Sequence, residues 1–312
     1  MITLHVVEMK KHISIILILL SSFSMLFSER FPGSSIEVSL PESYKFIEKE
    51  GIYLDRPNSS WMFFTQMPIA VDSDSINTLI EIRAARGGEL LQMKEISISD
   101  RKGFLYQVES HGPLERRMRE WNLTIASKKR SDTLTIAYPR MLEEKIGHKI
   151  EKILASAKVE NMGKIDLFEG LGFHIKKSPE RFTLTKKHSK VFLLSPDEID
   201  LNNLGKTGIT ITQYPRPSNI SPLDITRKTF DGTYLDGNTN ILRESSTETK
   251  EYIIAEIEFE ASIPGQAIKS RYLVTNIFGD SSFISVTGIA SDGEIEKISE
   301  AHQQIVSNVE FR

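Results

Sequence analysis

Two segments of the chain, one in the middle and one at the C-terminus, combine a strand-like apolar run with an amphipathic helix. In the first, LTIAYPRMLEEKIGHKIEKILASAKVE (134–160), apolar residues follow Pro139 at intervals of three or four, which predicts a helix with one buried face. In the second, FISVTGIASDGEIEKISEAHQQIVSNVEF (283–311), a strand pattern again precedes such a helix. Because the same strand-then-helix pattern occurs in the middle of the chain and at its C-terminus, we predict two copies of one folding unit.

Further pairs of segments recur in the same order, which supports a tandem duplication. The pairs are 35–47 with 172–185, 78–85 with 208–215, 103–110 with 251–261, and the two terminal segments. We interpret 78–85 (TLIEIRAA) and 208–215 (GITITQYP) as matching half-buried strands, because apolar and polar residues alternate in both. The colinear order, more than any single match, carries the prediction of two related units.

The spacing of these matches differs between the early and late parts of each copy. Ile82 pairs with Ile211, 129 positions further on, whereas Leu134 pairs with Phe283, 149 positions further on. The difference predicts an insertion of about twenty residues in the second copy, within 212–250. Inserted loops on a rigid scaffold often bind partners, but they also tolerate sequence drift, and both interpretations stay open.

Each copy therefore contains several short strands joined by hairpins, together with one or two helices. Turn chemistry in KKRSD (128–132), PGQ (264–266) and GDSS (279–282) separates strand-like runs and predicts hairpins. The predicted fold class is α+β, with two tandem α/β/α sandwich domains, each with a mainly antiparallel sheet and a C-terminal amphipathic helix. We place the first domain at 29–161 and the second at 165–312, with a short linker that favours a fixed angle between them.

These residues resemble a known family. A unit that opens on Ser39-Leu40-Pro41, contains KGFLYQVE (102–109) and closes on IEKILASAKV (150–159) resembles the PsbP-like fold, which the Mog-type nuclear import factor shares. The resemblance covers 35–312 as two copies and implies α/β/α sandwiches in mostly non-catalytic proteins: photosystem accessory subunits, import factors, bacterial envelope lipoproteins and secretion chaperones. It carries over no site residues, and the missing cysteine departs from the envelope lipoproteins.

The N-terminus has the layout of a secretory signal peptide. Basic residues at 10–11 precede the apolar run ISIILILLSSFSMLF (13–27), and small Ser28 follows. The run is shorter than the roughly 20 residues that a membrane-spanning helix needs, so we predict a signal peptide at 1–28 and a periplasmic or secreted protein. An uncleaved N-terminus would instead tether the protein, and this segment is the one membrane contact that we expect.

Charge and cysteine content exclude several classes of function. The formal net charge of −3 provides no positive field for nucleic acid, which we do not expect as a partner. Cysteine is absent, which removes thiol nucleophiles and zinc–thiolate sites. Histidines stand singly without paired metal-ligand spacing, and no nucleophile elbow or phosphate loop occurs. We therefore predict no cofactor, no metal and no enzyme activity.

One row of carboxylates offers the main alternative to a non-catalytic protein. Glu256, Glu258 and Glu260 alternate along one predicted strand and share a face, where they could bind a metal ion or act as acid and base. We favour cross-strand ion pairs, with Glu260 opposite Lys269 and Glu258 opposite Arg271 across a two-residue turn. The competing hypothesis is a hydrolase that uses Glu256 or Glu258 with His302.

Candidates for contact with a partner are aromatic or basic: Trp61, Phe63, Arg116, Arg119, Trp121 and Tyr234. Trp61 and Phe63 belong to WMFF (61–64), which either is buried on both faces of a covered sheet or forms a contact surface. The arginines belong to ERRMREW (115–121). This segment and KKHSK (186–190) could meet an acidic partner or lipid head groups, or form solvated loops.

Together these features predict a non-catalytic, exported, two-domain accessory protein of the bacterial envelope. We expect it to bind an unidentified envelope protein through the groove between its domains or through 212–250. The alternatives are the hydrolase with a non-standard Glu/His site and a membrane-tethered structural protein.

Overall fold

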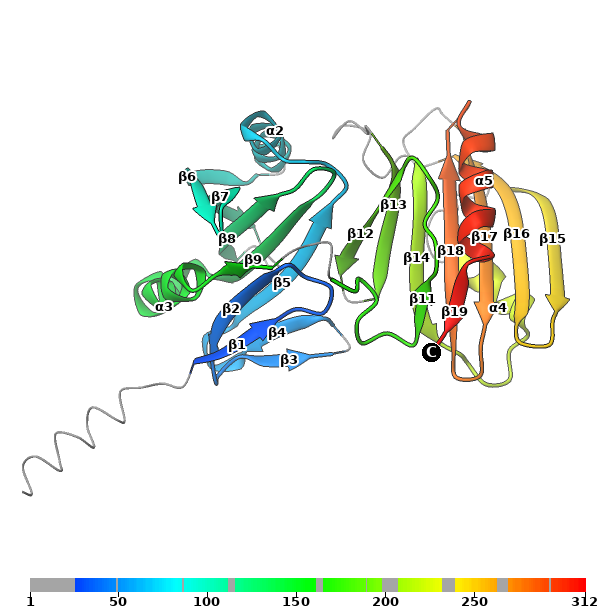
Figure 1. Cartoon of the computed structure of the whole chain (residues 1–312), viewed down its shortest axis with the longest axis horizontal. Helices are drawn as coiled ribbons and strands as arrows, with labels where there is room; N and C mark the ends of the chain where they lie inside the picture. The colour runs from blue at the N-terminus through cyan, green and yellow to red at the C-terminus, as the bar shows by residue number, and fades with distance from the viewer. Residues whose placement is uncertain are drawn as a thin grey trace, which may run out of the picture.

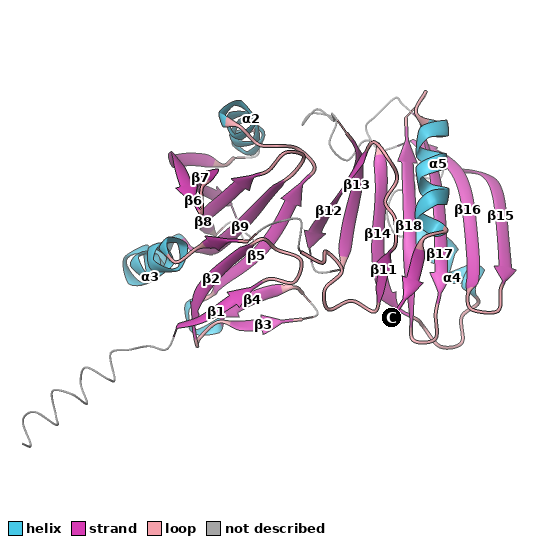
Figure 2. Ribbon diagram, viewed as in Figure 1, coloured by secondary structure: helices cyan, strands magenta, loops and turns pink. Residues whose placement is uncertain are grey.

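The computed structural model describes residues 26–48, 50–85, 87–111, 116–160, 165–188, 190–197, 207–231, 239–262, 269–291 and 293–312. These residues form two separate seven-stranded antiparallel sheets with helices packed against them (Figures 1 and 2). The predicted α+β class with two tandem, mainly antiparallel units is confirmed. The exact domain boundaries remain predictions.

The first sheet has the strand order β3-β4-β5-β9-β8-β7-β6. Its strands are β3 (Lys45–Ile47), β4 (Ile52–Asp55), β5 (Ser60–Met67), β6 (Glu89–Ile98), β7 (Arg101–His111), β8 (Arg117–Ala126) and β9 (Ser131–Pro139). A three-stranded sheet of β1 (Leu26–Arg30), β2 (Ile36–Pro41) and β10 (Lys158–Val159) accompanies it. Because β1 pairs with β2 along its whole length, cleavage after Ser28 would divide a paired strand.

The second sheet has the strand order β12-β13-β14-β18-β17-β16-β15. Its strands are β12 (Phe182–His188), β13 (Val191–Pro196), β14 (Gly208–Pro215), β15 (Asn240–Glu248), β16 (Ile253–Ser262), β17 (Lys269–Phe278) and β18 (Ser282–Ala290). Strands β11 (Phe173–Ile175) and β19 (Val309–Phe311) pair separately, so the C-terminus returns to the start of this unit. Position by position, the two sheets have the same topology.

The pairing of 78–85 with 208–215 is wrong, because 78–84 lies in helix α2 (Ser73–Ala84), whereas 208–215 forms β14. By topology the counterpart of β14 is β5, which contains WMFF. The offset that suggested an insertion therefore has no basis. The described parts of 212–250 are the end of β14, helix α4 (Pro222–Asp231) and β15, which take the places of β5, α2 and β6.

Helices cover opposite faces of each sheet, as Figure 1 shows for α4 and α5. In the second unit, α5 (Ile295–Val306) buries Ile298 and Ile305 against Ile284 and Val286 of β18. Phe283, which directly precedes Ile284, belongs to another cluster, with Ile225 of α4. Successive strand residues point to opposite faces, so the two helices lie on opposite sides of the sheet. This is the α/β/α layering that the sequence predicted for this unit.

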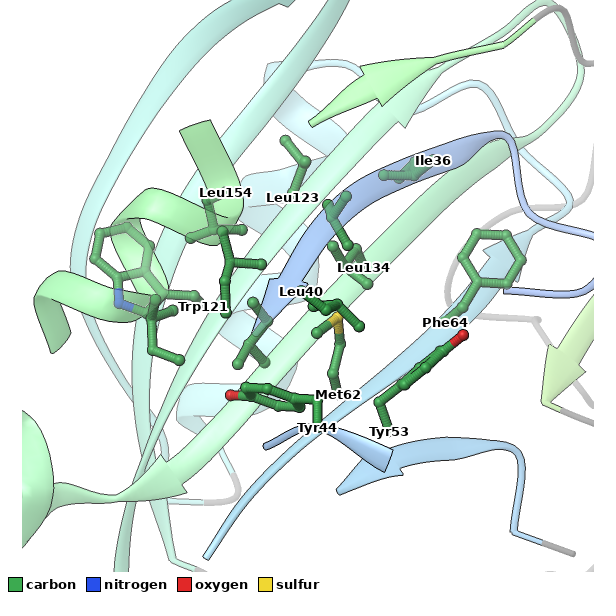
Figure 3. Close-up of a cluster of buried hydrophobic side chains, with 14 of the residues drawn as sticks. Ile36, Leu40, Tyr44, Tyr53, Met62, Phe64, Trp121, Leu123, Leu134 and Leu154 are labelled. Carbon is green, nitrogen blue, oxygen red and sulfur yellow. The ribbon is translucent and has the colours of Figure 1, made fainter. Parts of the chain in front are cut away.

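The first unit repeats this layering with α3 (Glu143–Ala155) and α2. The apolar stripe of α3 packs with β2 and with the sheet in one large core, part of which Figure 3 shows. On the other face, Ile76 of α2 packs with Phe104, Tyr106 and Val108 of β7. Short 3-10 helices, η1 (Arg56–Asn58) and η3 (Arg140–Leu142), precede β5 and α3. Met62 and Phe64 of β5 are in the large core, and Gln66 on the same face of β5 contacts the second unit.

Candidate binding site between the two units

The two units meet where edge strand β12 of the second sheet packs against β5 of the first, and Figure 1 shows these strands next to each other. Gln66 of β5 is central to this contact. Its Oε1 accepts a hydrogen bond from the backbone N–H of Lys186 at 2.7 Å, and its Nε2 donates to Asp132 Oδ1 at 3.0 Å. Gln66 is only 6% exposed, so one buried amide joins both units.

Asp132 anchors this network within the first unit. It is fully buried and accepts hydrogen bonds from the N–H of Ser35 at 3.1 Å and from the Ser35 hydroxyl. Burial raises the pKa of Asp132, although the hydrogen bonds from Ser35 and the nearby charge of Arg130 act in the opposite direction. A buried carboxyl group with these partners fixes the position of Gln66, and through it the position of β12.

A second set of contacts joins the end of β1 and the segment that follows it to the second unit. Lys186 Nζ donates to the carbonyl oxygen of Pro32 at 2.7 Å, and Arg30 pairs with Glu169 at 3.1 Å. Gly33 has a φ of +79°, and a Cβ there would lie 3.0 Å from the carbonyl oxygen of Leu167. Glycine is therefore required at this close approach of the two units.

Beside these contacts lies a cavity of about 240 Å³, which we call the interdomain cavity. The first unit contributes Phe31, Pro32, Phe46, Glu48, Gly51 and Phe64, and the second contributes Glu169, Gly170, Leu171, Lys186 and Lys190. The Phe31 ring is stacked with Phe64 at a centroid distance of 6.4 Å and meets Phe46 edge-on at 6.5 Å. Figure 3 shows Phe64, which belongs to this aromatic wall, and Tyr53 at one end of the core.

Charged groups surround the aromatic wall. Lys186 is buried, with 4% of its surface exposed, and lies 5.8 Å from the centroid of the Phe192 ring. Lys190 is half-buried and Glu48 is exposed. The sequence segment KKHSK thus contains a lysine that connects the units and another that lines the cavity, and is only in part a solvated loop. The cavity combines apolar aromatic surface with two lysines and two glutamates, Glu48 and Glu169.

The structure distributes the predicted partner-contact residues over several environments. Trp61 and Phe63 of β5 are half-buried and alternate with fully buried Met62 and Phe64, so neither face of WMFF is open surface. Trp121 is 5% exposed and belongs to the first core, where Figure 3 shows it beside α3. Its role as a surface contact therefore conflicts with its position.

The two predicted arginines lie in different environments. Arg119 is mostly buried and pairs with Glu109 at 3.2 Å and with Glu143 at 3.4 Å. Arg116 is exposed, and Tyr234 lies outside the described residues. None of the five predicted contact residues that the structure describes lines the interdomain cavity, so the sequence indicated a groove between the units but not the residues that form it.

The three glutamates Glu256, Glu258 and Glu260 lie on β16, and Glu258 pairs with an arginine on the neighbouring strand of the same sheet. The register places Glu260 opposite Arg271 and Ser262 opposite Lys269, so the predicted pairing is shifted by two residues. The connection between β16 and β17 is longer than the two-residue turn on which that register depended. Arg271 Nε nevertheless donates diagonally to Glu258 at 2.6 Å, which forms the expected kind of cross-strand ion pair.

His302 serves as a buried structural group. It is 5% exposed, and its Nε2–H donates to the carbonyl oxygen of Val286 at 3.1 Å. Burial lowers the pKa of His302, so the ring is neutral near pH 7. Among the described residues no group of three or more His, Asp or Glu side chains could hold a metal ion. The Glu258 and His302 side chains are thus engaged in contacts that stabilise the fold.

The lowered pKa of His302 gives a pH dependence of stability. The unfolded state binds a proton more readily than the folded state below about pH 6.5, so the free energy of unfolding should fall as the pH is lowered from there. The slope contributed by this residue is at most about 1.4 kcal/mol per pH unit. Urea unfolding at pH 7.5, 6.5 and 5.5 should show a smaller loss in His302→Gln, which can still donate to Val286. Equal losses in both proteins would contradict the assignment.

Comparisons with known proteins give structural similarities at low sequence identity. No protein-family model matches the chain, and no curated protein matches it. Cyanobacterial PsbP (CyanoP) from Synechocystis is 8% identical, with a TM-score of 0.31 over 45% of this chain and 93% of that one. The immunity protein TplEi from Pseudomonas aeruginosa is 10% identical, with a TM-score of 0.28 over 92% and 97% of the two chains.

A chain in the crystal structure of the Tle4–Tli4 complex is 9% identical, with a TM-score of 0.29 over 92% of this chain and 97% of that one. TM-scores as low as these three establish neither a family nor a function. The resemblance to the PsbP-like fold stays a prediction. Within the described residues no helix has the length and apolar character needed to cross a membrane.

Proposed function

We propose that this chain is a non-catalytic accessory protein of the bacterial envelope that holds a partner protein in the interdomain cavity. The observation that carries the proposal is an aromatic-lined cavity formed jointly by the two units, with the Phe31, Phe46 and Phe64 side chains on one side. Export rests on the predicted signal peptide, which lies mostly outside the described residues. The competing hydrolase has less support, because Glu258 and His302 are engaged in structural contacts.

The size and lining of the cavity favour a side chain from a partner protein as its occupant. Sites for small molecules and cofactors usually enclose about 300–1,000 Å³. The interdomain cavity, at about 240 Å³, is smaller. Protein interfaces are dominated by a few large side chains that fill well-packed, desolvated pockets. Aromatic walls suit such an anchor, because burial of apolar surface contributes about 25 cal/mol per Å².

The contacts between the units preform this pocket. The hydrogen bonds of Gln66 to Lys186 and Asp132, and the bond from Lys186 to Pro32, hold the two walls in place. A preformed pocket does not lose conformational freedom on binding, so more of the contact energy appears as affinity. This is the arrangement expected of a binding protein whose two units act as one body.

Phe46→Asp tests this function. Phe46 is 38% exposed, so the change should leave the fold intact while it places a charge in the aromatic wall. We expect capture of the partner from envelope extracts, measured by quantitative crosslinking and mass spectrometry, to fall at least about tenfold, since a lost anchor costs roughly 2 kcal/mol or more. Phe46→Leu, which keeps an apolar side chain, should retain most of the binding.

Met141→Asp provides the matched control, because Met141 is 86% exposed and does not line the cavity. It should capture as much partner as the wild type. Equal capture by Phe46→Asp and the wild type, with unchanged melting temperatures, would refute the cavity as the binding site.

A further inference from the structure

We propose that the occupant of the interdomain cavity presents a carboxylate to Lys186, next to the apolar side chain that fills the aromatic part of the cavity. This inference rests on the proposed function and specifies the chemistry of the partner: a segment in which an aromatic or large aliphatic residue stands close to Asp or Glu.

Within the described part of the chain, Lys186 is a buried cation without a carboxylate in contact. It lines the cavity with 4% of its surface exposed, and the one described hydrogen-bond partner of its Nζ is the carbonyl oxygen of Pro32. No Asp or Glu oxygen of the described chain forms an ion pair with it within 4.0 Å. An ammonium group has three N–H donors, so two remain for an acceptor that enters the cavity.

The fold uses Lys186 as a hydrogen-bond donor and does not need its positive charge. A buried ammonium group without a paired anion is unfavourable, because removal from water costs several kcal/mol. Burial accordingly lowers the pKa of Lys186 to about 8, while Glu169 and Asp166 act in the opposite direction from a distance. The bond to Pro32 needs a donor but not a charge. Perturbed ionisable groups in a cleft often belong to functional sites, which is consistent with an incoming anion.

Among the lining residues that the structure describes, the remaining charges around the cavity leave Lys186 as the charge without a nearby counterpart. Glu169 is already paired with Arg30, and it also accepts from the N–H of Gly33 at 3.4 Å. Of the other lining residues, Lys190 adds a second positive charge and exposed Glu48 a single negative one. A carboxylate beside Lys186 would also lie in a partly desolvated site, where charge-assisted hydrogen bonds are about twice as strong as neutral ones.

Peptide selection on the intact wild-type protein tests the inference without a destabilising mutation. A displayed library of twelve-residue peptides is selected against the wild type in the presence of excess soluble Phe46→Asp protein, which removes peptides that bind elsewhere. Synthetic peptides from the selection are then titrated by calorimetry beside matched versions in which each Asp or Glu is replaced by Asn or Gln. We expect the acidic versions to bind about tenfold or more tightly, and their advantage to shrink above pH 8 as Lys186 loses its proton.

Two lysine variants test whether the preference for acidic peptides depends on Lys186. The preference for the acidic peptide should disappear in Lys186→Met and persist in Lys187→Met, because Lys187 is exposed and does not line the cavity. Equal affinity of acid and amide peptides for the wild type would overturn the inference, while Phe46-dependent binding of both would leave the proposed function standing. A selection that yields no peptide sensitive to Phe46→Asp would count against the cavity as a binding site as well.

Discussion

Replacing Gln66 with leucine should lower the free energy of unfolding by about 2–4 kcal/mol and divide unfolding into two transitions. Leucine has a similar volume but leaves the Lys186 N–H without an acceptor and removes a donor from Asp132. Each buried polar group that loses its partner costs about 1–3 kcal/mol. The damage falls on the contact between the units, so each unit should then unfold with its own midpoint.

Differential scanning calorimetry and urea unfolding monitored by tryptophan fluorescence measure this effect. Gln92→Leu is the matched control, because Gln92 is exposed on β6 and bonds Gln107 within the first unit at 3.1 Å. The control should unfold like the wild type. If Gln66→Leu also behaved like the wild type, the hydrogen-bonded contact would not hold the units together.

Glu109→Gln should produce the second large loss, about 2–4 kcal/mol. Glu109 has a side-chain exposure of 8% and pairs with Arg117 at 2.8 Å, with Arg119 at 3.2 Å and with Arg140 at 3.2 Å. Removing one member of a buried ion cluster typically costs 3–5 kcal/mol, because it leaves uncompensated buried charge. We expect less here, since water and salt screen Arg117 and Arg140, which are about half exposed.

Urea midpoints at low and high salt test this prediction. Glu95→Gln, an exposed change on neighbouring β6, should shift the midpoint very little. The loss in Glu109→Gln should persist at 0.5 M NaCl in the part that comes from Arg119, whose side chain is 15% exposed. A loss abolished by salt would show that the arginine cluster acts only as a set of surface ion pairs.

The sequence was informative wherever a local pattern determines the structure. The apolar stripes predicted α3 and α5, and turn residues marked the β8–β9 and β17–β18 hairpins. Local alternation misled at TLIEIRAA, which is helical. A helix signal was present upstream, because Asp72 caps α2 by accepting the N–H of Ser75 at 2.8 Å. That cap, read together with WMFF as a strand, would have given the correct pairing of β5 with β14.

No local sequence pattern predicts which residues line the interdomain cavity. Phe31, Phe46 and Phe64 come from the first unit, and Leu171 and Lys186 from the second, so they meet only once both units have folded and docked. Lys186 stands in a run of basic residues, which on composition alone favours a solvated loop. Its burial follows from the packing of an edge strand onto another sheet, and no periodicity within β12 encodes that contact.

Site-specific photo-crosslinking tests most directly whether the partner enters the interdomain cavity. A benzophenone amino acid would replace Phe46 in the cavity wall in one protein and exposed Met141, which does not line the cavity, in another. Both proteins would be expressed in the native envelope and irradiated. If a partner protein enters the cavity, we expect a defined adduct with one envelope protein from position 46 and none from position 141. An adduct from position 141 without one from position 46 would contradict binding in the cavity.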